Sequence, residues 1–351
     1  PLWIMRRSLF ELQRASNPAC VGGAPSAVHA AGSPDVSMRA RVAACVAVAV
    51  LTSLLVLNIN HQLVEVRKLE RGDEQRDRVT FSLEYCDCSR TLTKVDNSSL
   101  VPYNATTCGR DAHQRGAHQK VAGFSFYGST TSKMHQMKKY FVGIKENLER
   151  MTELYGEDWV MRLYYDLEPS DQQLMGQLCD LVCANNNIDL CNIRQLPGSP
   201  VRDATEIFAM NWRFFPTLDP QVDIYLCRDL DSRVSEREVA AVEEWLGSGR
   251  AVHSMRDHPA HNTPLLGASW GARLDTEQQN VRHKWVRAWD KILADKLAWA
   301  ARGAKGPDQT VLQRHVWPWA RFVAMQHDSY TCHLYPHTIG WPTRRRREPT
   351  N

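Results

Sequence analysis

The chain has 351 residues, a net charge of +4 and 43% hydrophobic residues. This length and composition are enough for one large or two small domains with a sizeable core, and they exclude an intrinsically disordered protein. The small net charge partly reflects the run Arg344–Arg347, so the broad basic character of a nucleic-acid-binding protein is missing and no nucleic-acid partner is expected.

One long apolar segment lies near the N-terminus. Val42–Ile59 has about 18 residues without a charge, close to what one helix needs to cross the hydrocarbon core. Arg39 and Arg41 precede it and charges of mixed sign follow, so the positive-inside rule places residues 1–41 in the cytosol. A cleaved signal peptide is the main alternative, but no small-x-small cleavage site follows the segment. An uncleaved signal anchor is therefore predicted, with Met38 as a candidate for the true start.

Residues 60–119 are polar, charged and weakly periodic, as expected of a lumenal stem. They contain two N-glycosylation acceptors, Asn97-Ser98-Ser99 and Asn104-Ala105-Thr106, which fit a surface in the secretory pathway.

The cysteines give a second indication of the compartment. Past the apolar segment the chain carries an even set of eight: Cys86, Cys88, Cys108, Cys179, Cys183, Cys191, Cys227 and Cys332. An even set suits disulfides in an oxidising lumen. A zinc cluster of Cys179, Cys183 and Cys191 is the alternative, but no CxxC pair or nearby His supports it. Disulfides are expected, and their pairing stays open.

From residue 120 to 345, strand patterns alternate with helical patterns, and a short tail, 346–351, follows. Strands are expected at Val121–Tyr127, Trp159–Tyr165, Ile188–Ile193, Val222–Cys227 and Ala251–Met255. Helices are expected at 137–155, Ser170–Ala184 and Ala204–Phe215, and from a capping box of Ser235 and Glu238 to Gly247. This alternation predicts an α/β domain with a mostly parallel sheet flanked by helices. Ligands of such sheets bind beyond the carboxyl ends of the strands.

An Asp-x-Asp pair, Asp229 and Asp231, directly follows the expected strand Val222–Cys227. Residues i and i+2 of an extended segment project to one side, so these carboxylates could share a hard divalent cation. Such a cation can neutralise the diphosphate of a nucleotide-sugar as it departs. The spacing alone is weak, because an Asp pair between Arg228 and Arg233 is often a solvated turn.

The surrounding sequence resembles a known group of proteins. The stretch NWRFFPTLDPQVDIYLCRDLDSRVSEREVAAVEEWLGSGRAVHSMRDHPAHNTPLLGASWGAR is similar to a little-characterised group of glycosyltransferase-like proteins from bacteria and invertebrates. These resemble the A-type nucleotide-diphospho-sugar transferase superfamily. The likeness continues through GPDQTVLQRHVWPWA and HDSYTC to WPTRR. It implies a single Rossmann-like domain that binds a UDP- or GDP-sugar through Mn²⁺ or Mg²⁺. One departure is Ala268, where the group has a second glycine in GGMWG, and its methyl group could alter the donor-sugar pocket.

The resemblance also implies a set of metal ligands. By likeness to other DxD enzymes, Asp231 coordinates the metal directly, and Asp229 coordinates it or contacts ribose and a metal-bound water. Many A-type transferases use a C-terminal His as a third ligand, so His327 is a candidate and Asp328 the fallback. A surface or core histidine is the alternative for His327.

Donor-binding residues are expected on several strand ends. Ser125, Tyr127 and Gly128 lie at the end of the first strand, where related folds seat the base and ribose. Arg213 could reach the diphosphate. Arg228 and Arg233 either hold phosphate or orient the two aspartates. Gly267 and Gly271 would let backbone approach the donor sugar, with ordinary turn glycines as the alternative.

Three residues are candidates for catalysis. Asp257 and His258 follow the strand Ala251–Met255 and could bind the acceptor or act as general base if the reaction inverts the anomeric centre. A hydrogen-bonded loop scaffold is the alternative. Asp308 opens an expected helix and is either its cap or, by the resemblance, an acceptor-side or catalytic residue.

These features together predict a type II membrane glycosyltransferase of the Golgi, with its catalytic domain in the lumen and a glycan or glycoconjugate as acceptor. Two alternatives stay open. One is a non-catalytic, membrane-tethered glycan-binding protein that keeps the fold. The other is a metal-dependent phosphoesterase, although two-metal enzymes of that class carry larger carboxylate and histidine clusters.

Overall fold

A computed structural model describes residues 78–93, 101–127, 134–167, 171–276, 280–299 and 305–344. From Val79 onwards these residues belong to one compact unit. The predicted cytosolic tail, the predicted membrane span at 42–59, Asn97 and Gly128 lie outside the described residues. Within the described ranges, no helix is both long enough and apolar enough to cross a membrane.

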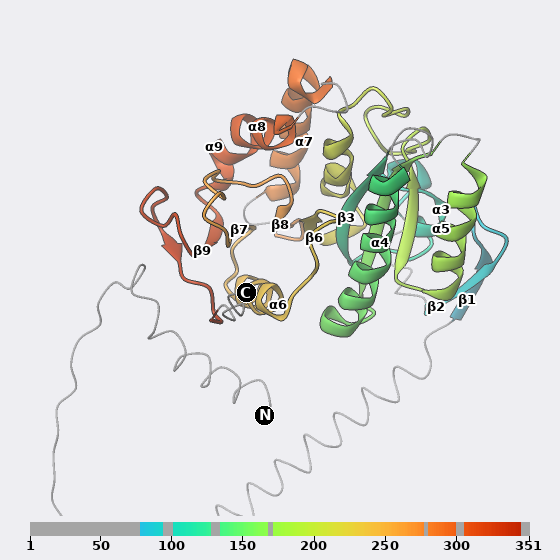
Figure 1. The fold of residues 1–351 in the computed structure, drawn as a ribbon. Coiled ribbons are helices and arrows are strands. Elements are labelled where there is room, and N and C mark those ends of the chain that lie inside the picture. Colours follow the sequence, from blue (N-terminus) through green and yellow to red (C-terminus); the bar gives the residue numbers. More distant parts are fainter. Residues whose placement is uncertain are drawn as a thin grey trace, which may run out of the picture. The chain divides into compact units, whose positions relative to one another are not determined.

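An eight-stranded sheet forms the centre of the unit, in the order β10-β9-β7-β8-β6-β3-β4-β5 (Figure 1). The strands are β3 (Gln119–Tyr127), β4 (Trp159–Asp166), β5 (Ile188–Asn192), β6 (Val222–Arg228), β7 (Val252–Arg256), β8 (Ser269–Arg273), β9 (Ala324–Asp328) and β10 (Thr338–Ile339). Strand β8 runs antiparallel to β6 and β7, and the other pairings are parallel. The predicted α/β class with a mostly parallel, mixed sheet is confirmed.

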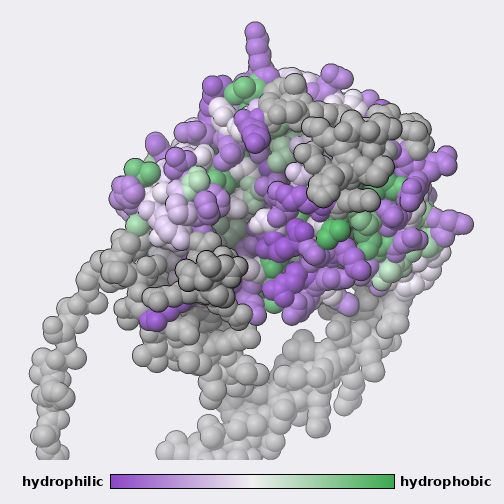
Figure 2. Space-filling view, viewed as in Figure 1, coloured by the Kyte–Doolittle hydropathy of each residue, from purple (hydrophilic) through white to green (hydrophobic). Residues whose placement is uncertain are grey.

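Helices cover both faces of this sheet. One face packs against α4 (Met134–Tyr155), α5 (Gln172–Ala184) and α6 (Glu236–Gly247). The other packs against the 3₁₀ helix η3 (Ala209–Leu218), α7 (Val281–Ala294), η5 (Lys296–Trp299), α8 (Pro307–Val311), the π-helical turn η6 (Leu312–Val316) and α9 (Trp317–Ala320). Alternation along β3 serves both layers, since Val121 packs with the second set and Phe124 with the first. On the face drawn in Figure 2 hydrophilic residues predominate, as expected over such a buried core.

Local sequence signals set several helix ends. The hydroxyl of Ser235 accepts a hydrogen bond from the backbone N–H of Glu238 at 3.3 Å, so the predicted cap of α6 is confirmed. Gly156 follows the last residue of α4 with φ +82°, a conformation that L-residues rarely adopt.

The helix expected over Ala204–Phe215 is wrong in its first half. Residues 204–208 form turns, and helical structure begins at Ala209 as a 3₁₀ helix. The indole Nε1 of Trp212 donates to the carbonyls of Ala204 and Ile207, each at 3.0 Å. The Ala204 carbonyl also accepts from the backbone N–H of Ile207 at 3.0 Å, in a turn that does not continue as an α-helix.

The segment expected to be a stem is folded onto the domain from residue 78 onwards, with 94–100 outside the described residues. Strands β1 (Arg78–Ser82) and β2 (Ser89–Thr93) form a two-stranded sheet, followed by η2 (Tyr103–Ala105) and α3 (Arg110–His113). Disulfides join this segment to α5 and β5: Cys86–Cys179, Cys88–Cys183 and Cys108–Cys191. The compact unit includes residues from Val79 onwards and so extends before the predicted start near Gln119. Cross-links between distant positions leave no local pattern in the sequence.

The same three bonds account for six of the eight expected cysteines and remove the zinc alternative for Cys179, Cys183 and Cys191. Cys227 is instead a buried thiol. Three disulfides in one domain fit a secretory or lumenal protein.

Candidate functional site

The parallel strands bring their carboxyl ends to one edge of the sheet. Strands β3, β4, β6, β7 and β9 all run in the same direction, because β6 and β7 are both antiparallel to β8. The Asp pair follows the end of β6 and therefore lies at this edge, where α/β proteins bind ligands.

The loop that carries the Asp pair is braced against α4. A Cβ on Gly143 would lie 2.1 Å from the carbonyl oxygen of Leu230, so only glycine lets the loop approach the helix this closely. The fully buried Asn147 donates to the same Leu230 carbonyl at 3.3 Å and accepts from the backbone N–H of Val234 at 3.1 Å. One amide side chain thus fixes two points of the loop.

A buried arginine holds the first aspartate of the pair. Arg213, on η3, is 1% exposed and forms ion pairs with Asp229 and, at 2.7 Å, with Asp308. Burial by itself would lower the pKa of Arg213, but the two carboxylates outweigh it and raise that pKa above its usual value. The guanidinium therefore stays charged and fixes Asp229 in place.

Asp308 reaches this ion pair as the second residue of α8. The N-cap of α8 is Gly306, so Asp308 does not cap the helix. A Cβ on Gly267 would lie 2.1 Å from Oδ2 of Asp308 and 3.1 Å from Nη2 of Arg213. The absence of a side chain at Gly267 makes room for the Arg213–Asp308 pair, a different role from the predicted approach to a donor sugar.

Two polar groups fix the backbone of η3 beneath the site. The hydroxyl of Ser125 accepts from the backbone N–H of Arg213 at 3.2 Å, and the hydroxyl of Tyr225 donates to the Arg213 carbonyl at 2.6 Å. The buried thiol of Cys227 donates to the Gly267 carbonyl at 3.1 Å, and burial raises its pKa to about 12. The predicted residues Ser125, Arg213, Asp229, Gly267 and Asp308 are thus brought together.

The second aspartate of the pair is the more accessible one. Asp231 forms an ion pair with Lys139 of α4 at 3.3 Å, and the side chains of these two residues are 38% and 58% exposed. The side chain of Asp229 is 35% exposed. Both carboxylates are therefore open to solvent on one side, and each already faces a cationic side chain.

The arginines that flank the pair orient it. Arg228 is buried and pairs with Glu238 of α6 at 2.9 Å, and it also donates to the carbonyl of Ser232 at 3.4 Å. Arg233 pairs with Glu146 of α4 and donates to the Leu230 carbonyl. Of the two roles left open for these arginines, their contacts support orientation of the loop.

His327 lies apart from the Asp pair. It is fully buried, with Nδ1 2.7 Å from Nε2 of His253 and Nε2 3.2 Å from Glu244 of α6. The fallback Asp328 is also buried, 2.6 Å from Arg256. The part of the chain that the structure describes contains no group of three or more His, Cys, Asp and Glu arranged to hold a metal ion. The contacts of His327 match the core-histidine alternative.

Asp257 and His258 follow β7 at the same sheet edge but have other partners. Asp257 forms an ion pair with Arg237 of α6 at 2.8 Å and accepts from the hydroxyl of Ser329 at 2.5 Å. His258 is exposed, and its Nδ1 accepts from the backbone N–H of Ala260 at 3.1 Å. These contacts hold the loop between β7 and β8.

Two further residues predicted to bind the nucleotide-sugar donor pack against neighbouring side chains. Gly271 lies inside β8, where a Cβ would come within 2.9 Å of Leu226 and of the Tyr225 carbonyl. Tyr127 is half-buried at the end of β3, its ring 5.7 Å from that of Trp212. Burial raises the pKa of Tyr127, against the opposing effect of Arg213, so its hydroxyl stays protonated at neutral pH.

Lys139 and Asn147 are site residues that the sequence reasoning missed. Both belong to a polar stripe at helical spacing on α4, formed by Lys139, Gly143, Glu146, Asn147 and Arg150. Arg150 completes the contact by donating to the Val234 carbonyl at 3.3 Å. The stripe runs beside the apolar positions that predict the helix. Its helical spacing indicates a second face of α4 that contacts a polar partner.

Comparison with known proteins adds little to this description. No protein-family model matches the chain, and neither does any curated protein. Among solved structures it is similar to the crystal structure of mouse xyloside xylosyltransferase 1 in its apo form, with 12% identity over 60% of this chain and 84% of that one. The TM-score of 0.33 does not establish a shared fold, and the α/β class rests on the chain's own sheet order.

Proposed function

We propose that this protein is a glycosyltransferase that moves a sugar from a UDP- or GDP-sugar to a glycan or glycoconjugate, assisted by Mn²⁺ or Mg²⁺ at Asp229 and Asp231. One observation carries the proposal: an accessible Asp pair lies at the carboxyl edge of a mostly parallel sheet, with Asp229 fixed by the buried Arg213. The sequence resemblance over residues 121–345 agrees with it.

The donor atoms at this edge suit a hard divalent cation. Carboxylate oxygens are its preferred ligands, and both Asp229 and Asp231 are about a third exposed, at 35% and 38%. Because His327 lies elsewhere, the protein would supply these two carboxylates, as is common for Mg²⁺ sites that use substrate phosphates as further ligands. When bound, the cation supplies positive charge that stabilises the departing diphosphate.

The chain's own residues would contribute positioning and charge. Arg213 fixes Asp229 before any ligand arrives, so little reorganisation is needed when negative charge develops. Lys139 can turn from Asp231 towards a phosphate, since its side chain is 58% exposed. Asn147 and Gly143 hold the loop that carries the Asp pair in close contact with α4.

We also propose that the domain acts in the lumen of the secretory pathway, in the Golgi, behind a membrane anchor at 42–59. Its three disulfides support this proposal, because they fit an oxidising compartment. Asn104 of the second glycosylation acceptor is exposed.

A donor screen tests the proposal. The purified protein is incubated with UDP- and GDP-sugars, with and without Mn²⁺, and release of UDP or GDP is measured. Mn²⁺-dependent release from at least one donor is expected. Absence of both release and metal-dependent UDP or GDP binding would favour a glycan-binding protein, and hydrolysis of simple phosphoesters would favour a phosphoesterase.

A further inference from the structure

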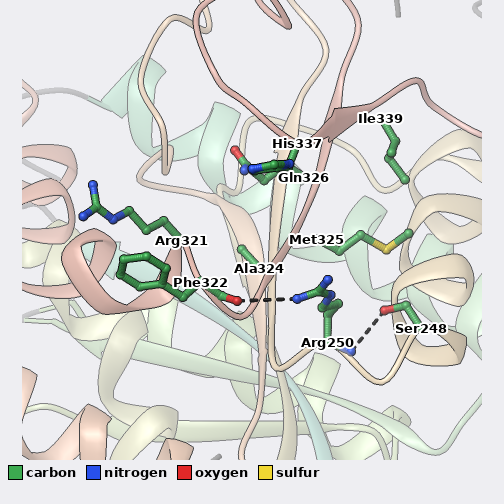
Figure 3. Close-up of a pocket in the computed structure, with 9 residues that line it drawn as sticks. All are labelled: Ser248, Arg250, Arg321, Phe322, Ala324, Met325, Gln326, His337 and Ile339. Carbon is green, nitrogen blue, oxygen red and sulfur yellow. Dashed lines mark hydrogen bonds between the residues drawn. The ribbon is translucent and has the colours of Figure 1, made fainter. Parts of the chain in front are cut away.

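A cavity of about 450 Å³ is lined by the nine residues drawn in Figure 3, which include neither Asp229 nor Asp231. It is lined by the residues that precede β7 and β9, by the first half of β9, and by β10. The Asp pair follows the carboxyl end of β6, whereas this cavity opens at the amino ends of β7 and β9. The two places are therefore on opposite edges of the sheet.

The lining of this cavity is cationic. Arg250 and Arg321 contribute guanidinium groups, His337 contributes an imidazole, and none of the nine lining residues is acidic. The guanidinium of Arg250 touches only a neutral acceptor there, the Phe322 carbonyl at 3.4 Å, as the dashed line in Figure 3 shows. Among the described residues neither arginine has an ion pair. The guanidinium of Arg321 lies over the ring of Phe322, 4.7 Å from its centroid, and points away from Arg250 in Figure 3. Each of the two unneutralised guanidinium groups suits a carboxylate or sulfate.

Apart from the polar side chains of Ser248 and Gln326, the rest of the lining is apolar. Phe322 is 68% exposed, the most exposed of the large hydrophobic side chains in the described part of the chain. Met325 and Ile339 add apolar surface along β9 and β10 (Figure 3). A free inorganic anion would leave this apolar surface unused. A pyranose ring has apolar C–H faces that pack on an aromatic ring, and it can carry an acidic group.

We propose that this cavity binds an anionic saccharide, a pyranose-containing fragment with carboxylate or sulfate groups. Arg250 and Arg321 each bind an acidic group of the saccharide, and Phe322 packs against the sugar ring with the ring face that Arg321 leaves open. The proposal goes beyond the proposed function, because it uses none of the residues around Asp229 and Asp231.

Calorimetric titration tests it with a sulfated, uronate-containing disaccharide from a glycosaminoglycan. The comparison ligands are the same disaccharide without sulfate groups and inorganic sulfate. We expect the sulfated disaccharide to bind more tightly than either. Arg250→Gln and Arg321→Gln should each weaken binding about tenfold, and Phe322→Ala should weaken binding of the disaccharide more than binding of sulfate.

Arg287→Gln is the matched control, since it removes an exposed arginine from α7 outside the cavity. It should leave binding unchanged. Asp231→Asn should also leave it unchanged, so failure of the proposed function and failure of this site can be told apart. The proposal is overturned if the disaccharide does not bind, if sulfate binds equally well, or if the Arg250 and Arg321 variants bind it as the wild type does. Loss of binding in Asp231→Asn would place the saccharide at the Asp pair and overturn it too.

Discussion

The position of Asp229 depends on the lack of a side chain at residue 267, which is glycine. Arg213 lies between Asp229 and Asp308, and the space for its contact with Asp308 exists because residue 267 is glycine. The orientation of the partly exposed Asp229 carboxylate thus depends on the packing of Gly267 and Asp308 inside the domain.

Gly267→Ala should therefore disturb both folding and binding. Its Cβ would lie 2.1 Å from Oδ2 of Asp308, so the buried ion pair must shift. We expect a loss of about 1–3 kcal/mol in the free energy of unfolding, measured by denaturant titration, and weaker Mn²⁺-dependent nucleotide binding. Gly176→Ala on α5 is the control, because a Cβ there meets nothing within 4 Å, and it should be neutral or slightly stabilising. Equal behaviour of the two variants would contradict this role for Gly267.

Lys139 should compete with a cation for Asp231. Its ammonium group lies 3.3 Å from the carboxylate that we assign to the metal. Lys139→Met should raise the affinity for Mn²⁺ alone by a few-fold, measured by calorimetry without nucleotide, because removing a nearby positive charge favours cation binding. Lys145→Met, on the same helix beside Glu149, should have no effect. An unchanged or lower Mn²⁺ affinity in Lys139→Met would place the cation away from Asp231.

At the scale of single elements, the sequence predicts those strands and helices that a local residue pattern defines. Short segments rich in apolar residues located β3, β4, β5, β6 and β7 to within two residues at either end, because the buried strands of a parallel sheet need apolar side chains. Strand β8 carries glycine at its centre, Gly271, which the sequence indicates as a place where backbone approaches the donor sugar or as an ordinary turn glycine. The site was predicted in part: Arg213, Asp229, Gly267 and Asp308 do meet, whereas the partners of His327 depend on the packing of α6 against β9.

The β1–β2 sheet is held to the domain by contacts between residues that lie far apart in the sequence. Arg90 of β2 and Arg115 both bind the fully buried Asp189 of β5, each at 2.7 Å. Burial would raise the pKa of Asp189, but Arg115 and Arg90 outweigh it and lower that pKa to about 2. The sequence around Asp189 contains no pattern that predicts a contact with Arg90 or Arg115.

The lowered pKa predicts how stability depends on pH. A carboxyl group whose pKa is lower in the folded than in the unfolded state, where it is about 3.9, stabilises the fold above about pH 4. That stabilisation is lost as the pH falls through the folded-state value of about 2. Asp189→Asn should cost about 3–5 kcal/mol at pH 7, because two arginines are left beside a neutral group.

Denaturant titrations at several pH values check this prediction. The difference between wild type and Asp189→Asn should shrink between pH 4 and pH 2, as the wild-type carboxyl becomes protonated. Asp158→Asn is the control, since that side chain is 85% exposed and its loss should change little. A stability difference that is constant down to pH 2 would contradict the ionised state of Asp189.

At the scale of the whole molecule, the folded unit is longer than the resemblance suggested. Residues 78–119 carry three of the half-cystines and both arginines that bind Asp189. A chain that begins at residue 78 should therefore be secreted with three disulfides. A chain that begins at residue 120 should be retained or aggregate, because Asp189 and three cysteines lose their partners.

Secretion yield and thiol counting after alkylation measure the outcome. Cys227 should resist alkylation at pH 8 until the protein is unfolded, because the thiol is buried and its pKa is raised to about 12. Normal secretion of the chain that begins at residue 120 would restore the stem interpretation of residues 78–119.

The central claim is that Asp229 and Asp231 bind a divalent cation for a nucleotide-diphosphate donor, and Asp231→Asn tests it most directly. The substitution keeps the side-chain volume at a position that is 38% exposed, so folding and secretion should be normal. Calorimetric titration of UDP and GDP with Mn²⁺ should then show a loss of metal-dependent binding of at least about a hundredfold relative to wild type. Metal-dependent nucleotide binding as tight as in the wild type would contradict the claim and leave the Asp pair as a solvated turn held by Arg213 and Lys139.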